Sequence, residues 1–320
     1  TAMLRGVSLL GVALSLVVLA GGTHALLMLA LWGLYLSIAN VGGRWYSFGW
    51  ETQLLETGLL GVFLCPLRSI RPFDERHRAP LIVIWLYRWL AFRIMLGSGL
   101  IKWRGDTCWR DYTCLDYHFE TQPIPGPFSA LFHHLPEGML HLGVGINHVA
   151  ELLLPFLVFG PRRLRHAAGF GLVAFQLTLI VSGNLAFLNW LTIIPCLACF
   201  DDRVLGWGAK RVRRVLAWGR PPEEHPPPPA DAVEVMKHPF TKTASMLRRN
   251  RGSTIVTALF AVVVAYKSAP VVKNLRKKEG QAMNRSFDRW HVVNTYGAFG
   301  SVTRERVELI VEGTRDDVSE

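Results

Sequence analysis

Ionisable side chains lie inside three apolar segments of this sequence, where charged groups are rare. The residues concerned are Glu51 and Glu56 in one segment, Arg88 and Arg93 in the next, and His148 and Glu151 in a later one. A charged group surrounded by lipid is costly, so such residues face partners or a water-filled cavity. Acidic and basic groups occur in similar number, so buried pairing that holds helices together explains them most simply. The sequence therefore predicts an intramembrane polar network, with a catalytic or binding cavity as the alternative.

Two other kinds of chemistry depend on the same segments. His148 and Glu151 are three residues apart on a helix face and, with His118 and Glu120, could hold a metal ion. A metal site needs three or four convergent ligands, and one His-x-x-Glu pair occurs often by chance, so we expect no metal. Lys102 could act as a base, but a lysine that snorkels at a helix end is far commoner. We expect no catalytic residue and no cofactor.

The five cysteines fall into two groups. Cys65, Cys196 and Cys199 lie in apolar segments, where a cysteine is usually a small buried hydrophobe. Cys108 and Cys114 share a polar loop, and we predict that they form a disulfide. A disulfide there requires an oxidising compartment on that side of the membrane.

Long apolar blocks position these residues. Half of the 320 residues are hydrophobic, and a spanning helix needs about 20 mostly apolar residues. The blocks that approach this length are 3–21, 25–41, 48–67, 81–101, 139–159, 167–182, 185–200 and 254–269. We therefore expect an all-α polytopic membrane bundle of about 8 transmembrane helices, followed by the start of a lumenal β-rich domain.

Charge in the connecting loops sets the expected orientation. Basic residues follow the third, fifth and seventh blocks, and such loops stay in the cytoplasm. The resulting domains are a bundle over 1–200 with a lumenal loop over 102–138, a basic, proline-containing cytoplasmic loop over 201–253, a last span over 254–270, and a lumenal C-terminus over 271–320. The net charge of +11 is spread over these loops, where it meets anionic membrane lipid, and we expect no nucleic-acid binding.

The last fifty residues differ from the rest of the chain. Polar and apolar residues alternate over 303–311, which is typical of a strand, so we predict a β-rich domain that the sequence cuts short. The sequence begins at Thr1 within an apolar block, and we expect it to be a fragment. Asn284, in Asn284-Arg285-Ser286, is a predicted glycosylation site on the lumenal side.

Several blocks of residues resemble those of the lipase maturation factor family. These blocks are 48–58, 92–106, 108–111, 117–123, 133–134, 147–148, 182–192 and 293–301, in the same order along the chain. The resemblance covers most of residues 24–314.

The resemblance implies a multi-pass membrane protein of the endoplasmic reticulum. Such a factor helps secreted lipases of the lipoprotein lipase type to fold and assemble as dimers, without catalysing a reaction. Its lumenal C-terminal domain contacts the client, which makes Tyr296 and Phe299 candidate client-facing residues. The alternative is an intramembrane enzyme similar to the vitamin K-dependent carboxylase, which would use buried Lys, Glu and His groups.

Overall fold

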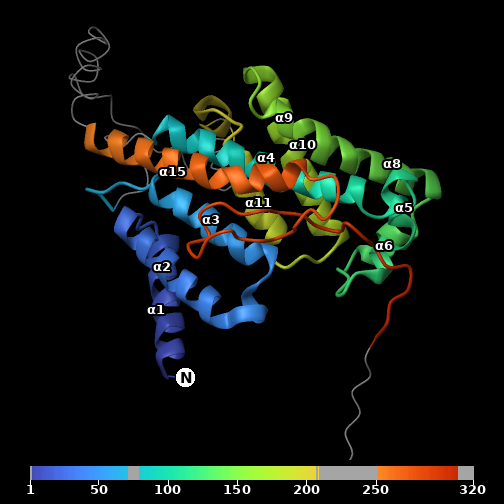
Figure 1. Ribbon diagram of the computed structural model, residues 1–320, viewed down its shortest axis with the longest axis horizontal. Coiled ribbons are helices and arrows are strands. Elements are labelled where there is room, and N and C mark those ends of the chain that lie inside the picture. The colour runs from blue at the N-terminus through green and yellow to red at the C-terminus, as the bar shows by residue number, and fades with distance from the viewer. Residues whose placement is uncertain (1, 71–78, 207, 209–250, 309–320) are drawn as a thin grey trace, which may run out of the picture.

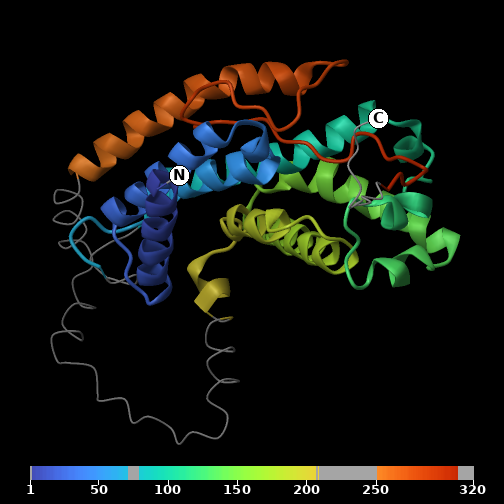
Figure 2. The same cartoon turned by 90° about the horizontal axis from the view of Figure 1, so that it is seen from below.

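Helices make up the described part of this protein; most of the long ones run along the long axis of Figure 1, and the N-terminal helix is steeply inclined to them (Figures 1 and 2). The computed structural model describes residues 2–70, 79–206, 208 and 251–308. The helices are α1 (Ala2–Leu19), α2 (Ala25–Gly42), the 3₁₀ turn η1 (Gly43–Tyr46), α3 (Gly49–Val62), α4 (Leu81–Arg104), α5 (Thr107–Arg110), α6 (Leu115–Thr121), α7 (Ser129–His133), α8 (Glu137–His148), the π-helix η2 (Val149–Leu153), α9 (Leu154–Leu157), α10 (Arg162–Ser182), α11 (Leu188–Leu197) and α15 (Arg251–Arg276).

Six helical segments in the described part of the chain are long and apolar enough to cross a membrane, two fewer than predicted. They are Ala2–Leu19, Ala25–Tyr46, Leu81–Arg104, Glu137–Leu157, Arg162–Ser182 and Thr254–Arg276. The blocks 48–67 and 185–200 instead form α3, of 14 residues, and α11, of 10 residues. At 1.5 Å per residue these helices are about 21 Å and 15 Å long, less than the ~30 Å hydrocarbon core.

Local sequence explains why α3 and α11 are short. Turns follow α3 directly and lead into Pro66, which has no N–H to continue a helix. Pro195 lies inside α11, close to its last residue. An apolar block therefore overestimated each helix, because hydropathy alone does not register a turn within the block.

Two ends of the bundle can be distinguished by their contacts. At one end, Arg162 pairs with Asp201 at 2.6 Å, and Arg165 donates to the carbonyl of Cys199 at 3.0 Å. At the other end, which carries the Cys108–Cys114 disulfide, Ser129 donates to the carbonyl of Ser182 at 2.9 Å. We call these the basic end and the disulfide end. The connections thus gather in two groups at opposite ends of the bundle.

The segment 277–308, called the tail here, lies across the bundle as an extended chain (red in Figure 1). An isolated bridge between Ser286 and Asn294 is present, but no strand forms in the tail as far as the structure describes it. The predicted β-rich domain is therefore wrong up to residue 308, and 309–320 lie outside the described residues. The tail's backbone groups bond instead to side chains and turns of the bundle, which removes the need for a neighbouring strand.

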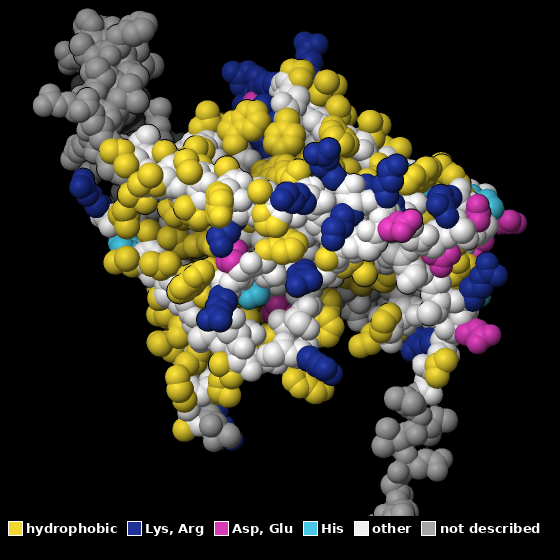
Figure 3. Space-filling view, viewed as in Figure 1, with side chains coloured by type: hydrophobic (Ala, Val, Ile, Leu, Met, Phe, Trp, Pro, Cys, Tyr) yellow, Lys and Arg dark blue, Asp and Glu magenta, His cyan; other side chains and the backbone are white. Residues whose placement is uncertain are grey.

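The core lies where α4, α9 and α10 meet, around the fully buried Leu90, Val158 and Leu172. On the face shown in Figure 3, hydrophobic side chains cover much of the surface, while acidic side chains gather near α5 and α6. No residue of α1 is buried. An apolar exterior of this extent is typical of a surface in contact with lipid. Most of the predicted cytoplasmic loop 201–253, including its proline run 226–229, lies outside the described residues.

Candidate functional site

A buried polar cluster joins α3, α4 and the tail around Glu56. Arg93, 1% exposed, forms an ion pair with Glu56 and donates to the carbonyl of Asn294 at 2.8 Å. The hydroxyl of Tyr296 donates to Glu56 Oε2 at 2.7 Å, and the backbone N–H of Asn294 donates to the same oxygen at 3.1 Å. A buried charge is tolerated when it is paired and hydrogen-bonded in this way. The structure thus brings together Glu56 and Arg93.

Glu51 and Arg88 lie apart from this cluster. Glu51 accepts hydrogen bonds from the hydroxyl of Tyr35 and from the indole N–H of Trp50, the latter at 3.0 Å. Arg88 donates to the carbonyl of Ala198 at 2.8 Å, and its guanidinium lies 5.0 Å from the centre of the Trp85 ring. Neither residue makes an ion pair with any other described residue. Neutral donors and acceptors serve these two charges, so one continuous network does not form.

A second buried cluster joins α4 to α8 and the π-helix that follows it. Lys102 Nζ lies 2.6 Å from Glu151 Oε1 and donates to Asn147 Oδ1 at 2.9 Å. Asn147 Nδ2 donates to the other Glu151 oxygen at 3.1 Å. Both charged side chains are only 5% exposed, so the pair is neutral as a unit and nearly sealed from solvent.

The π-helix η2 separates Glu151 from its neighbour His148. Pro155 cannot donate a backbone hydrogen bond, and a wide π turn accommodates such a break in the helical ladder. His148 therefore points toward α5, where its Nε2 donates to the carbonyl of Trp109 at 2.8 Å. Glu151 points toward α4, where Gly99 leaves the space: a Cβ there would lie 2.9 Å from Glu151 Cβ. The structure assigns the two residues to different contacts, although their spacing suggested one shared face.

His118 and Glu120 complete the set that could have held a metal ion. No group of three His, Cys, Asp or Glu side chains with suitable geometry occurs among the described residues. The His118 ring packs edge-on against Phe299, with 4.9 Å between ring centres. Burial, reinforced by the Lys102 ammonium, lowers the pKa of His118 to about 4. This histidine is therefore neutral at physiological pH.

The Cys108–Cys114 disulfide closes a small loop that holds the tail. Both cysteines are buried, and their Cα atoms are 4.7 Å apart. Trp109, within this loop, donates from its indole N–H to the carbonyl of Phe299 at 2.8 Å. The other three cysteines, Cys65, Cys196 and Cys199, are free thiols. The disulfide that the sequence predicted is present, and it orients a tryptophan that contacts the tail.

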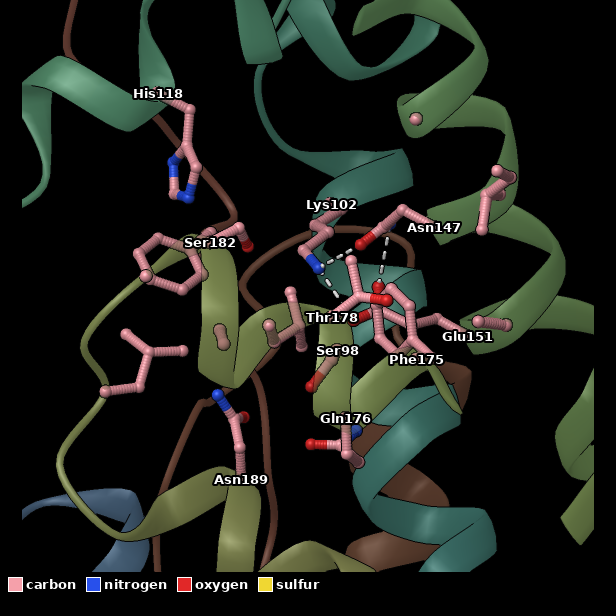
Figure 4. A pocket seen from close by; sticks show the side chains of 18 of the residues that line it. Ser98, Lys102, His118, Asn147, Glu151, Phe175, Gln176, Thr178, Ser182 and Asn189 are labelled. Atoms are coloured by element: carbon pink, nitrogen blue, oxygen red, sulfur yellow. Dashed lines mark hydrogen bonds and ion pairs between the residues drawn. The ribbon is translucent and has the colours of Figure 1, made fainter. Parts of the chain in front are cut away.

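A cavity of about 560 Å³ lies beside the Lys102–Glu151 pair (Figure 4). Its walls are mostly apolar and come from α8, α10 and α11, with further residues from α4, α6 and the tail. Its polar lining includes Lys102, Asn147, Glu151, Gln176 and Asn189. A mostly apolar cavity of this volume with a few convergent polar groups is typical of a small-molecule site.

Comparison with known proteins shows the family. The lipase maturation factor transmembrane domain, as a family, matches residues 1–207, which include every helix from α1 to α11. This chain belongs to the lipase maturation factor family. Lipase maturation factor 1 of Homo sapiens is 48% identical over 313 residues, which cover 96% of this chain and 52% of that protein.

Other relatives support the same assignment. Lipase maturation factor 1 of Bos taurus is 47% identical over 321 residues, covering 98% of this chain and 54% of the relative. Lipase maturation factor 2 of Homo sapiens is 39% identical over 230 residues, covering 66% of this chain and 32% of the relative. The chain is thus most like lipase maturation factor 1 and spans about half the length of the two lipase maturation factor 1 relatives. No solved structure matches this chain.

The three tail residues that the sequence analysis singled out contact the bundle. Tyr296 is buried against Glu56, and Phe299 is partly buried against His118. Asn284 Nδ2 donates to the carbonyl of Gly297 at 3.1 Å, so glycosylation would have to precede this packing. Client contact by Tyr296 or Phe299 and glycosylation of Asn284 remain predictions.

Several buried polar residues of this chain were not predicted from the sequence. Asn294 is completely buried and bonds to Glu56, while Gln176 and Asn189 line the cavity. An uncharged amide inside a predicted span gives a weak signal, because it barely lowers the hydropathy of the block. Gln176 and Asn189 could have been noticed as amides within apolar blocks, whereas Asn294 lies in the segment that was predicted to begin a β-rich domain.

Proposed function

We propose that this chain is the membrane part of an endoplasmic-reticulum maturation factor that assists secreted lipases of the lipoprotein lipase type to fold and assemble as dimers. The single observation that carries the proposal is the 48% identity with lipase maturation factor 1 of Homo sapiens over 96% of this chain. A factor of this kind acts by binding its client and catalyses no reaction.

The proposed location is the endoplasmic-reticulum membrane, with the C-terminus and the disulfide end in the lumen. The Cys108–Cys114 disulfide supports this orientation because disulfides persist in oxidising compartments. Arg162 and Arg165 lie at the opposite end, as expected for a cytoplasmic face. Protease protection of an epitope placed after Glu320 tests the orientation: protection in intact microsomes supports it, and digestion contradicts it.

A chimera tests the proposed function. This chain would replace the matching residues of human lipase maturation factor 1, in cells that lack the native factor and express a lipoprotein-lipase-type lipase. We expect the chimera to restore secreted lipase activity while the amount of lipase synthesised stays constant. Normal abundance of the chimera in the endoplasmic reticulum without any restored activity would contradict the proposal.

The Lys102–Glu151 pair beside the cavity supports a second candidate, an intramembrane enzyme. A lysine next to a carboxylate in an apolar cavity could transfer a proton to a bound molecule. Replacing both residues together, by Lys102→Met and Glu151→Leu, removes the charges without leaving one unpaired. A folding factor keeps its lipase-activating function in this double variant if the chimera still folds, whereas an enzyme that depends on the pair loses it.

A further inference from the structure

The cavity contains three buried amide side chains whose hydrogen-bonding groups are not all used. Gln53 donates to Thr192 Oγ1 at 2.9 Å, but its carbonyl oxygen has no partner among the described residues. Gln176 makes one weak contact, at 3.5 Å to the sulfur of Met95. Asn189, 4% exposed, makes no side-chain hydrogen bond to any part of the chain that the structure describes. Figure 4 shows Gln176 and Asn189 facing the cavity.

An amide in an apolar interior is unfavourable unless it is hydrogen-bonded. Gln176 is 3% exposed, similar to Asn189, so both side chains have little contact with bulk solvent. An amide both donates and accepts hydrogen bonds. The missing partner is therefore a group that can do the same, such as a hydroxyl or another amide.

The charge of the cavity excludes an ionic ligand head. Among its described lining residues, Lys102 and Glu151 are the charged ones, and their 2.6 Å ion pair cancels them. His118, which also lines the cavity, is neutral at physiological pH. A carboxylate or phosphate would find no free cation here and would approach the Glu151 carboxylate.

The cavity opens between two helical segments that are long enough to span the membrane, Glu137–Leu157, which begins with α8, and Arg162–Ser182, which is α10. On α8, the lining residues Leu142 and Ile146 are 62% and 53% exposed. On α10, the lining residues Ala174 and Thr178 are also exposed. The rest of the wall between them is largely apolar and includes Phe175. An opening with such a rim at the depth of two spans admits a molecule from the lipid phase.

We propose that this cavity binds an uncharged, single-chain amphiphile drawn from the membrane. Its hydrogen-bonding head contacts Gln53, Gln176 and Asn189, and its hydrocarbon chain passes between α8 and α10. The volume of about 560 Å³ suits one chain with a small head rather than a complete two-chain lipid. Monoacylglycerols and long-chain amides belong to this chemical class.

Photocrosslinking tests the proposal. The probe is a monoacylglycerol with a diazirine in its acyl chain, applied to the full chain in phosphatidylcholine nanodiscs. We expect labelled peptides from 139–151 and 171–192. Unlabelled monooleoylglycerol should compete at about tenfold lower concentration than oleate, which has the same chain and an anionic head. Labelling spread evenly over the lipid-exposed helices, or equal competition by oleate, would overturn the proposal.

Variants locate the site. Asn189→Leu removes an amide of the proposed head contact, and we expect labelling to fall about tenfold, as for the loss of one good hydrogen bond. Ala174→Trp narrows the opening and should reduce labelling to a similar extent. The matched control is Leu177→Trp, because Leu177 is exposed on α10 but does not line the cavity. Equal labelling of the two tryptophan variants would contradict the proposed site. If a variant fails to fold, the competition between monooleoylglycerol and oleate on the unmodified protein tests the proposal instead.

Discussion

The backbone N–H of Asn294 donates a 3.1 Å hydrogen bond to the carboxylate of Glu56, which lies 238 residues earlier in the chain. Arg93 pairs with the same carboxylate and donates to the carbonyl of Asn294, so both backbone groups of one tail residue are used. The tail is thus part of the buried polar core of the bundle. A change in this core is expected to affect the tail as well as the helices.

Replacing Arg93 tests the energetic role of this core. In Arg93→Leu the Glu56 carboxylate stays buried without its ion-pair partner, and we expect the free energy of unfolding to fall by about 3–5 kcal/mol. Arg163→Leu is the control because Arg163 is exposed. Denaturant or thermal melts in the same detergent measure both variants. Equal midpoints for the two would show that the ion pair adds no stability.

Gly97 tests the contact between α4 and the tail. A Cβ at this position would lie 2.3 Å from the carbonyl oxygen of Tyr296, so Gly97→Ala must displace the tail. We expect a loss of about 1–3 kcal/mol in stability, as for other overpacked positions. The control is Gly33→Ala in α2, where a Cβ meets no atom within 4 Å. Limited proteolysis of the tail should accelerate in the first variant alone, and unchanged cleavage of Gly97→Ala would contradict the contact.

The disulfide has a modest expected effect on stability. Cys108 and Cys114 are six residues apart, so the ring they close is small. Its loss in a Cys108→Ala, Cys114→Ala double variant should lower the free energy of unfolding by about 2 kcal/mol. Cys65→Ala, which removes a free thiol, is the control. Peptide mapping without reductant checks the bond itself, and two free thiols in protein from the secretory pathway would refute it.

His118 predicts a pH dependence of stability. Its pKa is about 4 in the folded chain, below the value of about 6.5 expected when unfolded. The unfolded chain therefore binds the proton more tightly, so this residue's contribution is complete above about pH 6.5 and declines as the pH falls toward 4. In His118→Phe the melting temperature should depend less on pH across that range than in the parent protein. An equally steep dependence in this variant would assign the effect to other groups.

The charged residues of the core could be predicted from the sequence. Glu56 and Arg93 stand out in apolar blocks because each lowers the hydropathy and requires a partner. Their partner Asn294 could not be identified, because hydrogen bonding across such a separation depends on how the tail crosses the bundle. The partners of Lys102 could not be identified from the sequence either. Its position at a helix end suggested snorkelling, whereas its side chain is buried and contacts Glu151 and Asn147.

Some helix lengths and the structure of the tail could not be predicted from hydropathy or from the alternation of polar and apolar residues. The long blocks around α1 and α4 were recognisable because about 20 mostly apolar residues in succession fit one structure. The block that contains α3 also contains a turn, which hydropathy averages away. Polar and apolar alternation over 303–311 suggested a strand, but residues 303–308 form no strand and are all exposed. The part of the tail that is buried in succession is Val293 to Tyr296, which bundle side chains contact, and a pattern of period two does not predict this.

The hydrogen bonds between the tail and Glu56 can form only late in the synthesis of the chain. A ribosome adds about 5–20 residues per second, so the 238 residues between Glu56 and Asn294 take roughly 10–50 s to make. During that interval Glu56 lacks the hydrogen bonds that Asn294 and Tyr296 later donate. The Glu56 carboxylate therefore gains its full set of hydrogen bonds only after the tail has been synthesised and has packed against the bundle.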